Sequence, residues 1–178
     1  ELDFEDAVSL FAAGVKAGAA AGADLIIIET MSDCLETKAA VLAAKENSDL
    51  PVFVTNAYDA SHKLMTGASP AAMVAMLEGL HANAIGVNCS LGPEQMLPVV
   101  EELIRYASVP VIVQPNAGIP RTVGGKTIYD VDAEAFSDVM VKIAEMGTSI
   151  LGGCCGTTPE FIRLTSEKTR RIPYLPPE

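Results

Sequence analysis

The sequence lacks tryptophan, is poor in positive charge and has no long apolar run. Its 178 residues include 12 Lys and Arg against 23 Asp and Glu, which gives a formal net charge of -11. An acidic chain of this kind is poorly suited to nucleic acid or to an anionic membrane surface, and we expect neither as a partner. The apolar run that comes closest to a membrane-spanning helix, residues 17–28, contains Asp24 and is shorter than the roughly 18 residues required.

The beginning of the sequence, ELDFEDAV, has no basic leader and does not resemble a signal peptide. We therefore expect a cytoplasmic protein, in which the four cysteines are thiols or metal ligands and not disulfides. Hydrophobic residues make up 49% of the chain, and the length allows one domain with a sizeable core.

What the sequence does have is a regular alternation of strand-like and helix-like runs. Apolar, mostly β-branched runs predict five strands, at 24–30, 50–56, 84–88, 110–114 and 149–152. Helical runs with caps or amphipathic patterns are predicted at 4–21, 37–47, 70–81, 93–107, 132–146 and 160–171. This alternation predicts an α/β fold of five βα units, with a parallel sheet covered by helices.

Three further segments carry expectations of their own. The strand at 24–30 is so uniformly apolar that we expect it to be buried on both faces. Residues 118–129 are predicted to be a long loop at the functional face. The three prolines in residues 172–178 predict an extended tail.

Three cysteines follow directly after two of the predicted strands. Cys89 follows 84–88, and the pair Cys154 and Cys155 follows 149–152. Right-handed crossovers bring the carboxyl ends of parallel strands to one face, where α/β enzymes keep their chemistry. Three thiolates meeting there would suit zinc and would leave its fourth position open.

Neighbouring residues of a strand point to opposite faces, so the paired cysteines can share a metal only if the strand ends before them. Glycines at 152, 153 and 156 allow the backbone to turn there. Other interpretations are buried apolar thiols, a bond between the two paired cysteines, or a phosphate cradle formed by Gly152-Gly153 before the helix start at Thr158. Cys34 lies at a helix start and is interpreted as structural.

Polar residues also occur at the ends of other strands. Glu29 ends a very apolar strand, where a carboxylate is costly unless it has a partner such as a helix terminus or a cation. Asn116 follows 110–114 and could satisfy loop backbone; Asn56 and Asn88 could line a pocket or bond loop amides. Nothing around the two histidines, at 62 and 81, indicates a ligand role.

The segments GVNCSLGP, QPNAG and GGCCGTTPE, in that order, resemble the zinc-binding homocysteine domain of the homocysteine S-methyltransferase family. The resemblance runs from about residue 24 to about residue 170. Within the family, QPNAG and the residues after the paired cysteines are more similar to cobalamin-dependent methionine synthases than to betaine-dependent enzymes.

This resemblance implies a TIM-type (β/α)8 barrel, of which the chain (1–178) would be the last five units. It implies that Cys89, Cys154 and Cys155 bind zinc, that Glu29 holds the ammonium group of homocysteine, and that Asn116 provides an oxygen ligand before substrate arrives. The zinc would activate the homocysteine thiolate for attack on a methyl group, with methylcobalamin as the donor.

Cobalamin and methyltetrahydrofolate would then bind to other domains or proteins. An open barrel has an uncovered sheet edge, so we also expect a homodimer through that edge. Two alternative functions remain at this point: a zinc-stabilised module without catalytic activity, and a phosphate-binding barrel enzyme.

Overall fold

The computed structural model describes residues 2–177, so residue 1 of the predicted domain and residue 178 of the predicted tail lie outside it. The strands are β1 (Ile26–Met31), β2 (Val52–Asn56), β3 (Ala84–Asn88), β4 (Val111–Gln114), β5 (Arg121–Val123), β6 (Lys126–Ile128) and β7 (Ile150–Leu151). The helices are α1 (Phe4–Ala20), α2 (Cys34–Asn47), α3 (Pro70–Gly79), α4 (Pro93–Tyr106), α5 (Ala133–Glu145) and α6 (Pro159–Thr169).

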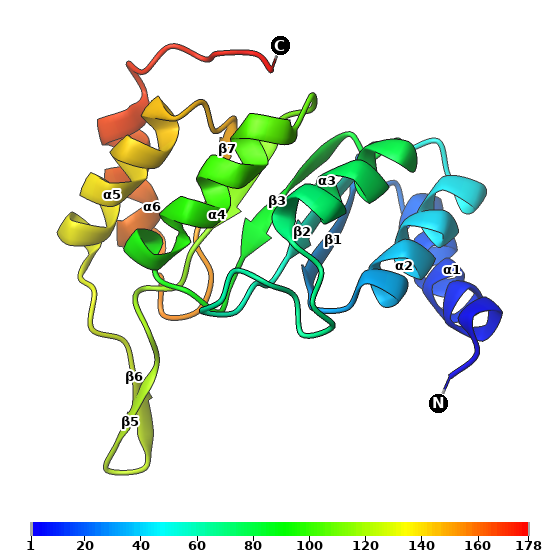
Figure 1. Cartoon of the computed structure of the whole chain (residues 1–178), viewed down its shortest axis with the longest axis horizontal. Coiled ribbons are helices and arrows are strands. Elements are labelled where there is room, and N and C mark those ends of the chain that lie inside the picture. Colours follow the sequence, from blue (N-terminus) through cyan, green and yellow to red (C-terminus); the bar gives the residue numbers. More distant parts are fainter. Residues whose placement is uncertain (1, 178) are drawn as a thin grey trace.

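Five of these strands form one parallel sheet in the order β1-β2-β3-β4-β7. The predicted α/β fold of five βα units is therefore confirmed, with each strand within a few residues of its expected position (Figure 1). Because all five strands run parallel, their carboxyl ends lie at the same edge of the sheet. That edge is where the predicted site residues belong.

The helices begin where the sequence supplies caps. The side chains of Asp3, Asp33, Ser69 and Asp132 each accept a hydrogen bond from a backbone N–H in the first turn of α1, α2, α3 and α5. Helices α3, α4 and α6 have proline at the start of the helix, where its missing N–H costs nothing.

The main core lies between the sheet and the helices that cover its outer face. On each strand, alternate residues point toward these helices, and Val52, Val54, Ile85, Val87 and Val113 are all fully buried. Helix α1 packs against α2 at one end of the molecule, and α5 pairs with α6 at the other (Figure 1). None of the described helices is both long enough and apolar enough to cross a bilayer.

The expectation that the first strand is buried on both faces is wrong. Ile27 is 51% exposed and Leu25, just before β1, is 37% exposed. The physical reason is position: β1 is an edge strand, and while Ile26 and Ile28 pack against the main core on one face, the other face is left open. The inner face of the sheet therefore presents apolar side chains at this edge.

The segment predicted as a long loop contains a β-hairpin. Strands β5 and β6 pair in antiparallel fashion and project from the carboxyl edge of the sheet (Figure 1). Gly124 and Gly125 form the turn with φ angles of 56° and 76°. Two successive positive φ angles favour glycine and suit the twist of a two-residue hairpin loop. The hairpin residues are exposed along its whole length.

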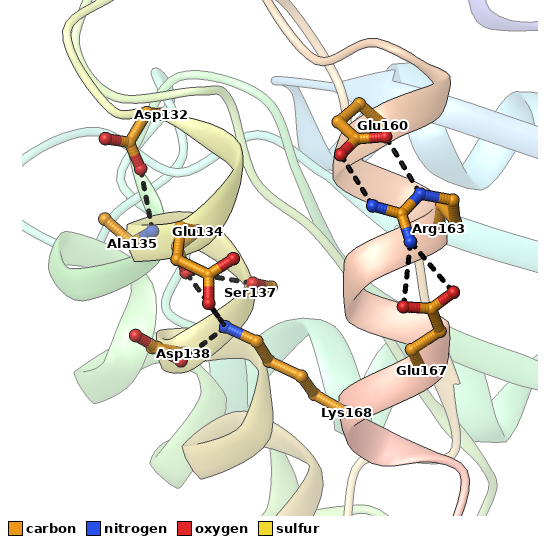
Figure 2. Close-up of polar contacts among 9 residues, drawn as sticks. All are labelled: Asp132, Glu134, Ala135, Ser137, Asp138, Glu160, Arg163, Glu167 and Lys168. Atoms are coloured by element: carbon orange, nitrogen blue, oxygen red, sulfur yellow. Dashed lines mark hydrogen bonds and ion pairs between the residues drawn. The ribbon is translucent and has the colours of Figure 1, made fainter.

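Ion pairs reinforce the pairing of α5 with α6. Lys168 on α6 donates to Glu134 and Asp138 on α5 at 2.7 and 2.6 Å, and Arg163 bonds Glu160 and Glu167 within α6 (Figure 2). Beneath these pairs, the Phe136 and Phe161 rings meet edge to face, with centroids 5.3 Å apart. Helix α6 is thus fixed to its neighbour directly after the turn that carries the paired cysteines.

Candidate metal centre

The three cysteines predicted to meet do so at the carboxyl edge of the sheet. The sulfur atoms of Cys89, Cys154 and Cys155 all lie within 4.8 Å of one another. The Cys89–Cys155 and Cys154–Cys155 sulfur distances are 3.7 and 3.9 Å. Two sulfurs bound tetrahedrally to one zinc ion at about 2.3 Å lie about 3.8 Å apart. The donor set therefore fits zinc in both chemistry and spacing.

The same distances exclude a bond between the paired cysteines in this structure. A disulfide requires a sulfur–sulfur distance of about 2.05 Å, and all four cysteines are free. The strand β7 ends at Leu151, so Cys154 and Cys155 belong to a turn and not to a strand. This removes the constraint that successive strand residues face opposite sides.

Hydrogen bonds attach the cysteine turn to the turn that follows β4. The Cys154 amide donates to Pro115 O at 2.8 Å, and Ala117 N donates to Cys155 O at 2.9 Å. The Cys155 amide donates to Asn116 Oδ1 at 3.1 Å. Three bonds thus hold the paired cysteines against residues 115–117, which fixes their position relative to the sheet.

The glycines of this turn are required for different reasons. Only Gly156 has a positive φ, 81°, and a Cβ there would lie 2.4 Å from the Tyr129 ring. A Cβ at Gly152 would lie 2.9 Å from Gln114 Cγ, and one at Gly153 would lie 2.7 Å from Thr157 Oγ1. Close packing therefore accounts for Gly152 and Gly153 without a bound phosphate.

The thiols differ in their electrostatic environment. Burial, together with hydrogen bonding to Cys89, raises the pKa of the Cys154 thiol to about 12. Hydrogen bonding to Cys89, and more weakly to Cys154 and Tyr129, lowers the pKa of the exposed Cys155 thiol. A bound cation would stabilise all three thiolates and would offset the burial of Cys154.

Glu29 and Asn116 lie at the same edge, as the sequence predicts. Glu29 is exposed on the inner face of the sheet, and its Oε1 accepts a hydrogen bond from Gln114 Nε2 at 3.1 Å. This bond joins β1 to β4 across two intervening strands. Asn116 is 3% exposed, and its Oδ1 is occupied by the Cys155 amide.

The remaining candidates lie elsewhere or have other contacts. Cys34 is at the start of α2, where its sulfur lies 3.4 Å from Met76 Sδ, and it does not belong to the cluster. His62 and His81 are also absent from it. Two residues beside the cluster were not predicted as site residues. Tyr129 hydrogen-bonds the Cys155 thiol. Asn88 directly precedes Cys89 and contacts Cys154.

Comparison with known proteins is consistent with this site. The family described as homocysteine S-methyltransferase matches residues 1–169. The methionine synthases of Mycobacterium leprae and Mycobacterium tuberculosis are 36% and 38% identical over 148 residues. These alignments cover 80% of this chain but 12% of each relative, so the chain spans about an eighth of their length.

Solved structures share the fold. The apo form of the Escherichia coli homocysteine methyltransferase MmuM superposes with a TM-score of 0.77 at 24% identity, covering 94% of this chain and 58% of MmuM. Its metallated form gives a TM-score of 0.72 at 26% identity, with 92% and 52% covered. With the family match over nearly its whole length, the chain belongs to the homocysteine S-methyltransferase family.

Proposed function

We propose that this chain contains the zinc and homocysteine site of a homocysteine S-methyltransferase that forms methionine. The observation that carries the proposal is the convergence of Cys89, Cys154 and Cys155 within 4.8 Å at the carboxyl edge of the sheet. When bound by three cysteine thiolates, zinc supplies an open coordination position at which a substrate thiol is deprotonated. A free thiol is mostly protonated near neutral pH, and only its thiolate is a good nucleophile.

The residues around the cluster would bind and orient the substrate. The Glu29 carboxylate would accept hydrogen bonds from the ammonium group of homocysteine. Gln114, which already donates to Glu29, would hold the Glu29 side chain in place. Asn116 would hold the cysteine turn through the Cys155 amide, and its oxygen is also the proposed fourth ligand before substrate arrives.

The proposed reaction is a methyl transfer. A bond forms between the homocysteine sulfur and the methyl carbon, while the bond from that carbon to the donor breaks and its electron pair stays with the donor. The thiol proton leaves to solvent. We propose methylcobalamin as the donor, bound with methyltetrahydrofolate on other domains or proteins, because the QPNAG motif and the residues after the cysteines resemble cobalamin-dependent enzymes.

The first test is the metal content of protein purified under reducing conditions with zinc supplied. We expect about one zinc per chain, and X-ray absorption should show one more sulfur ligand after homocysteine is added. Cys154→Ser should lose most of the zinc, whereas Cys34→Ser, outside the cluster, should keep it. A wild-type protein that binds no zinc would refute the proposal.

A second test separates a substrate site from a purely structural zinc site. Glu29→Gln removes the carboxylate charge but keeps the side-chain size. We expect this variant to retain zinc and to lose most of its affinity for homocysteine, measured by calorimetry. Unchanged homocysteine affinity would favour the structural alternative. Stabilisation of the wild type by added phosphate would favour the phosphate-binding alternative.

A further inference from the structure

The side-chain amide of Asn88, at the end of β3, is 2% exposed and has all its hydrogen-bonding positions filled. Its Oδ1 accepts from the Thr30 amide at 2.9 Å and from Thr55 Oγ1 at 2.8 Å. Its Nδ2 donates to Thr30 Oγ1 at 2.7 Å and to Cys154 Sγ at 3.8 Å. An amide has two lone pairs and two N–H groups, so rotating it by 180° would oppose the Thr30 N–H with another donor. Its orientation is therefore fixed.

The partners of Asn88 come from three separate parts of the site. Thr30 follows Glu29 and has a φ of 62°, an unfavourable angle for a β-branched residue, where the pairing of β1 with β2 is interrupted. Cys154 lies 66 residues away in the turn after β7. The residue after Asn88 is Cys89, also in the left-handed region with a φ of 61°. The Asn88 amide thus connects the turn beside Glu29 with the Cys154 thiol, and the Asn88 backbone leads directly into Cys89.

Asn56 offers a matched comparison on the adjacent strand. It also ends its strand and is fully buried, and its Nδ2 donates to Met31 O and to Thr37 Oγ1. Neither of these partners is a cysteine, whereas Asn88 donates to the Cys154 sulfur. A role limited to stabilising the fold would make the two asparagines equivalent.

We propose that Asn88 is a positioning residue that holds the Cys154 sulfur and the Thr30 turn in a single arrangement around the metal centre. This inference rests on the proposed zinc site. An N–H···S hydrogen bond directs the sulfur lone pairs, and residues that orient metal ligands typically change metal affinity by about 10–100-fold when replaced. Asn88 reaches the reacting groups only through Cys154 and Thr30, so its effect should appear in metal binding itself.

The test compares zinc affinity, by competition with a chromophoric chelator, in the wild type, Asn88→Ala and Asn56→Ala. We expect Asn88→Ala to weaken zinc binding about 10-fold or more, and Asn56→Ala to change it by less than about twofold. In cobalt-substituted protein, the sulfur-to-cobalt charge-transfer band should shift or weaken in Asn88→Ala and stay as in the wild type in Asn56→Ala.

A second pair of variants tests the positioning role of Asn88 if Asn88→Ala does not fold. Thr30→Ala removes the acceptor of the Asn88 amide, whereas Thr30→Ser keeps the hydroxyl. We expect weaker zinc binding in Thr30→Ala and near wild-type binding in Thr30→Ser; equal affinities would overturn the inference.

The outcomes also separate this inference from the proposed function. A wild type that binds no zinc overturns both. A wild type that binds zinc, with Asn88→Ala unchanged or with Asn56→Ala weakened by the same factor, overturns the positioning role alone.

Discussion

Cys154 and Cys155 are neighbours in the chain, but their thiols have different surroundings. Cys154 is half-buried with a pKa raised to about 12, and Cys155 is exposed with a lowered pKa. Because the thiolate is the nucleophile, metal-free reduced protein should be alkylated by iodoacetamide at Cys155 several-fold faster than at Cys154 near pH 7.5. Mass spectrometry of peptides sampled over time gives both rates.

The pH dependence of the alkylation rates follows from the same pKa shifts. Lowering the pH from 8.5 toward 7 should slow alkylation of Cys154 more than that of Cys155, since the pKa of Cys155 is lowered and its thiolate persists to lower pH. Added zinc should protect the paired cysteines and leave Cys34 unprotected. Equal rates at the paired cysteines would contradict the assignment of their environments.

Gly156 is the one glycine of the cysteine turn that needs a left-handed backbone. Alanine there would have to adopt a φ near 81° and would meet the Tyr129 ring. The conformational cost alone is about 1–2 kcal/mol, so we expect Gly156→Ala to unfold at lower denaturant concentration and to bind zinc more weakly.

Gly14 provides the control for that substitution. It lies in the middle of α1, and a Cβ there would meet nothing within 4 Å. Gly14→Ala should therefore stabilise the protein by about 0.5–1 kcal/mol. Chemical denaturation of the two variants tests both values, and a Gly156→Ala variant as stable as the wild type would show that the turn is not strained.

At the residue scale, sequence alone predicted which thiols meet but not what holds them. Cys89 and the paired cysteines each follow a strand, and parallel topology then brings them together. The bonds of Asn88 depend on residues 30, 55 and 154, which only the folded sheet brings within reach. No spacing in the sequence encodes that combination.

At the scale of elements, the five strands were predictable because each is a short apolar run between capped helices. The β5–β6 hairpin was missed although a signal was present. The runs RTV and KTI flank Gly124-Gly125, and two glycines between β-branched residues are typical of a tight hairpin. The exposure of β1 had no such signal, because an apolar run does not reveal whether its strand lies at an edge.

Helix α6 offers a prediction about how neighbouring elements are joined. Lys168 connects α6 to Glu134 and Asp138 of α5, whereas Arg163 bonds only within its own helix (Figure 2). Lys168→Met should therefore lower the thermal unfolding midpoint more than Arg163→Met does, and raising the salt concentration should reduce the difference because salt screens ion pairs. Equal midpoints at low salt would show that the connection between the helices contributes nothing.

At the scale of the whole molecule, the described residues form an open, curved sheet and not a closed barrel. The hydrogen bond from Gln114 to Glu29 crosses two strands, which requires the sheet to curl as a barrel wall does. The chain covers 58% of MmuM, a protein with the same fold. The thiol cluster nevertheless lies within one continuous part of the wall, between the ends of β3, β4 and β7.

An open sheet exposes apolar surface, and this leads to a prediction about association. β1 is an edge strand with unpaired backbone groups, and its Ile27 is 51% exposed on the inner face. We expect the 18.6 kDa chain to dimerise through this edge with rising concentration, and Ile27→Lys to prevent it, because a charge on an edge strand opposes strand pairing. Ile162→Lys, on the outer surface of α6 at 44% exposure, should dimerise like the wild type. Sedimentation equilibrium measures all three masses. A wild type that stays monomeric at every concentration, or an Ile27→Lys variant that still dimerises, would show that this edge does not mediate self-association.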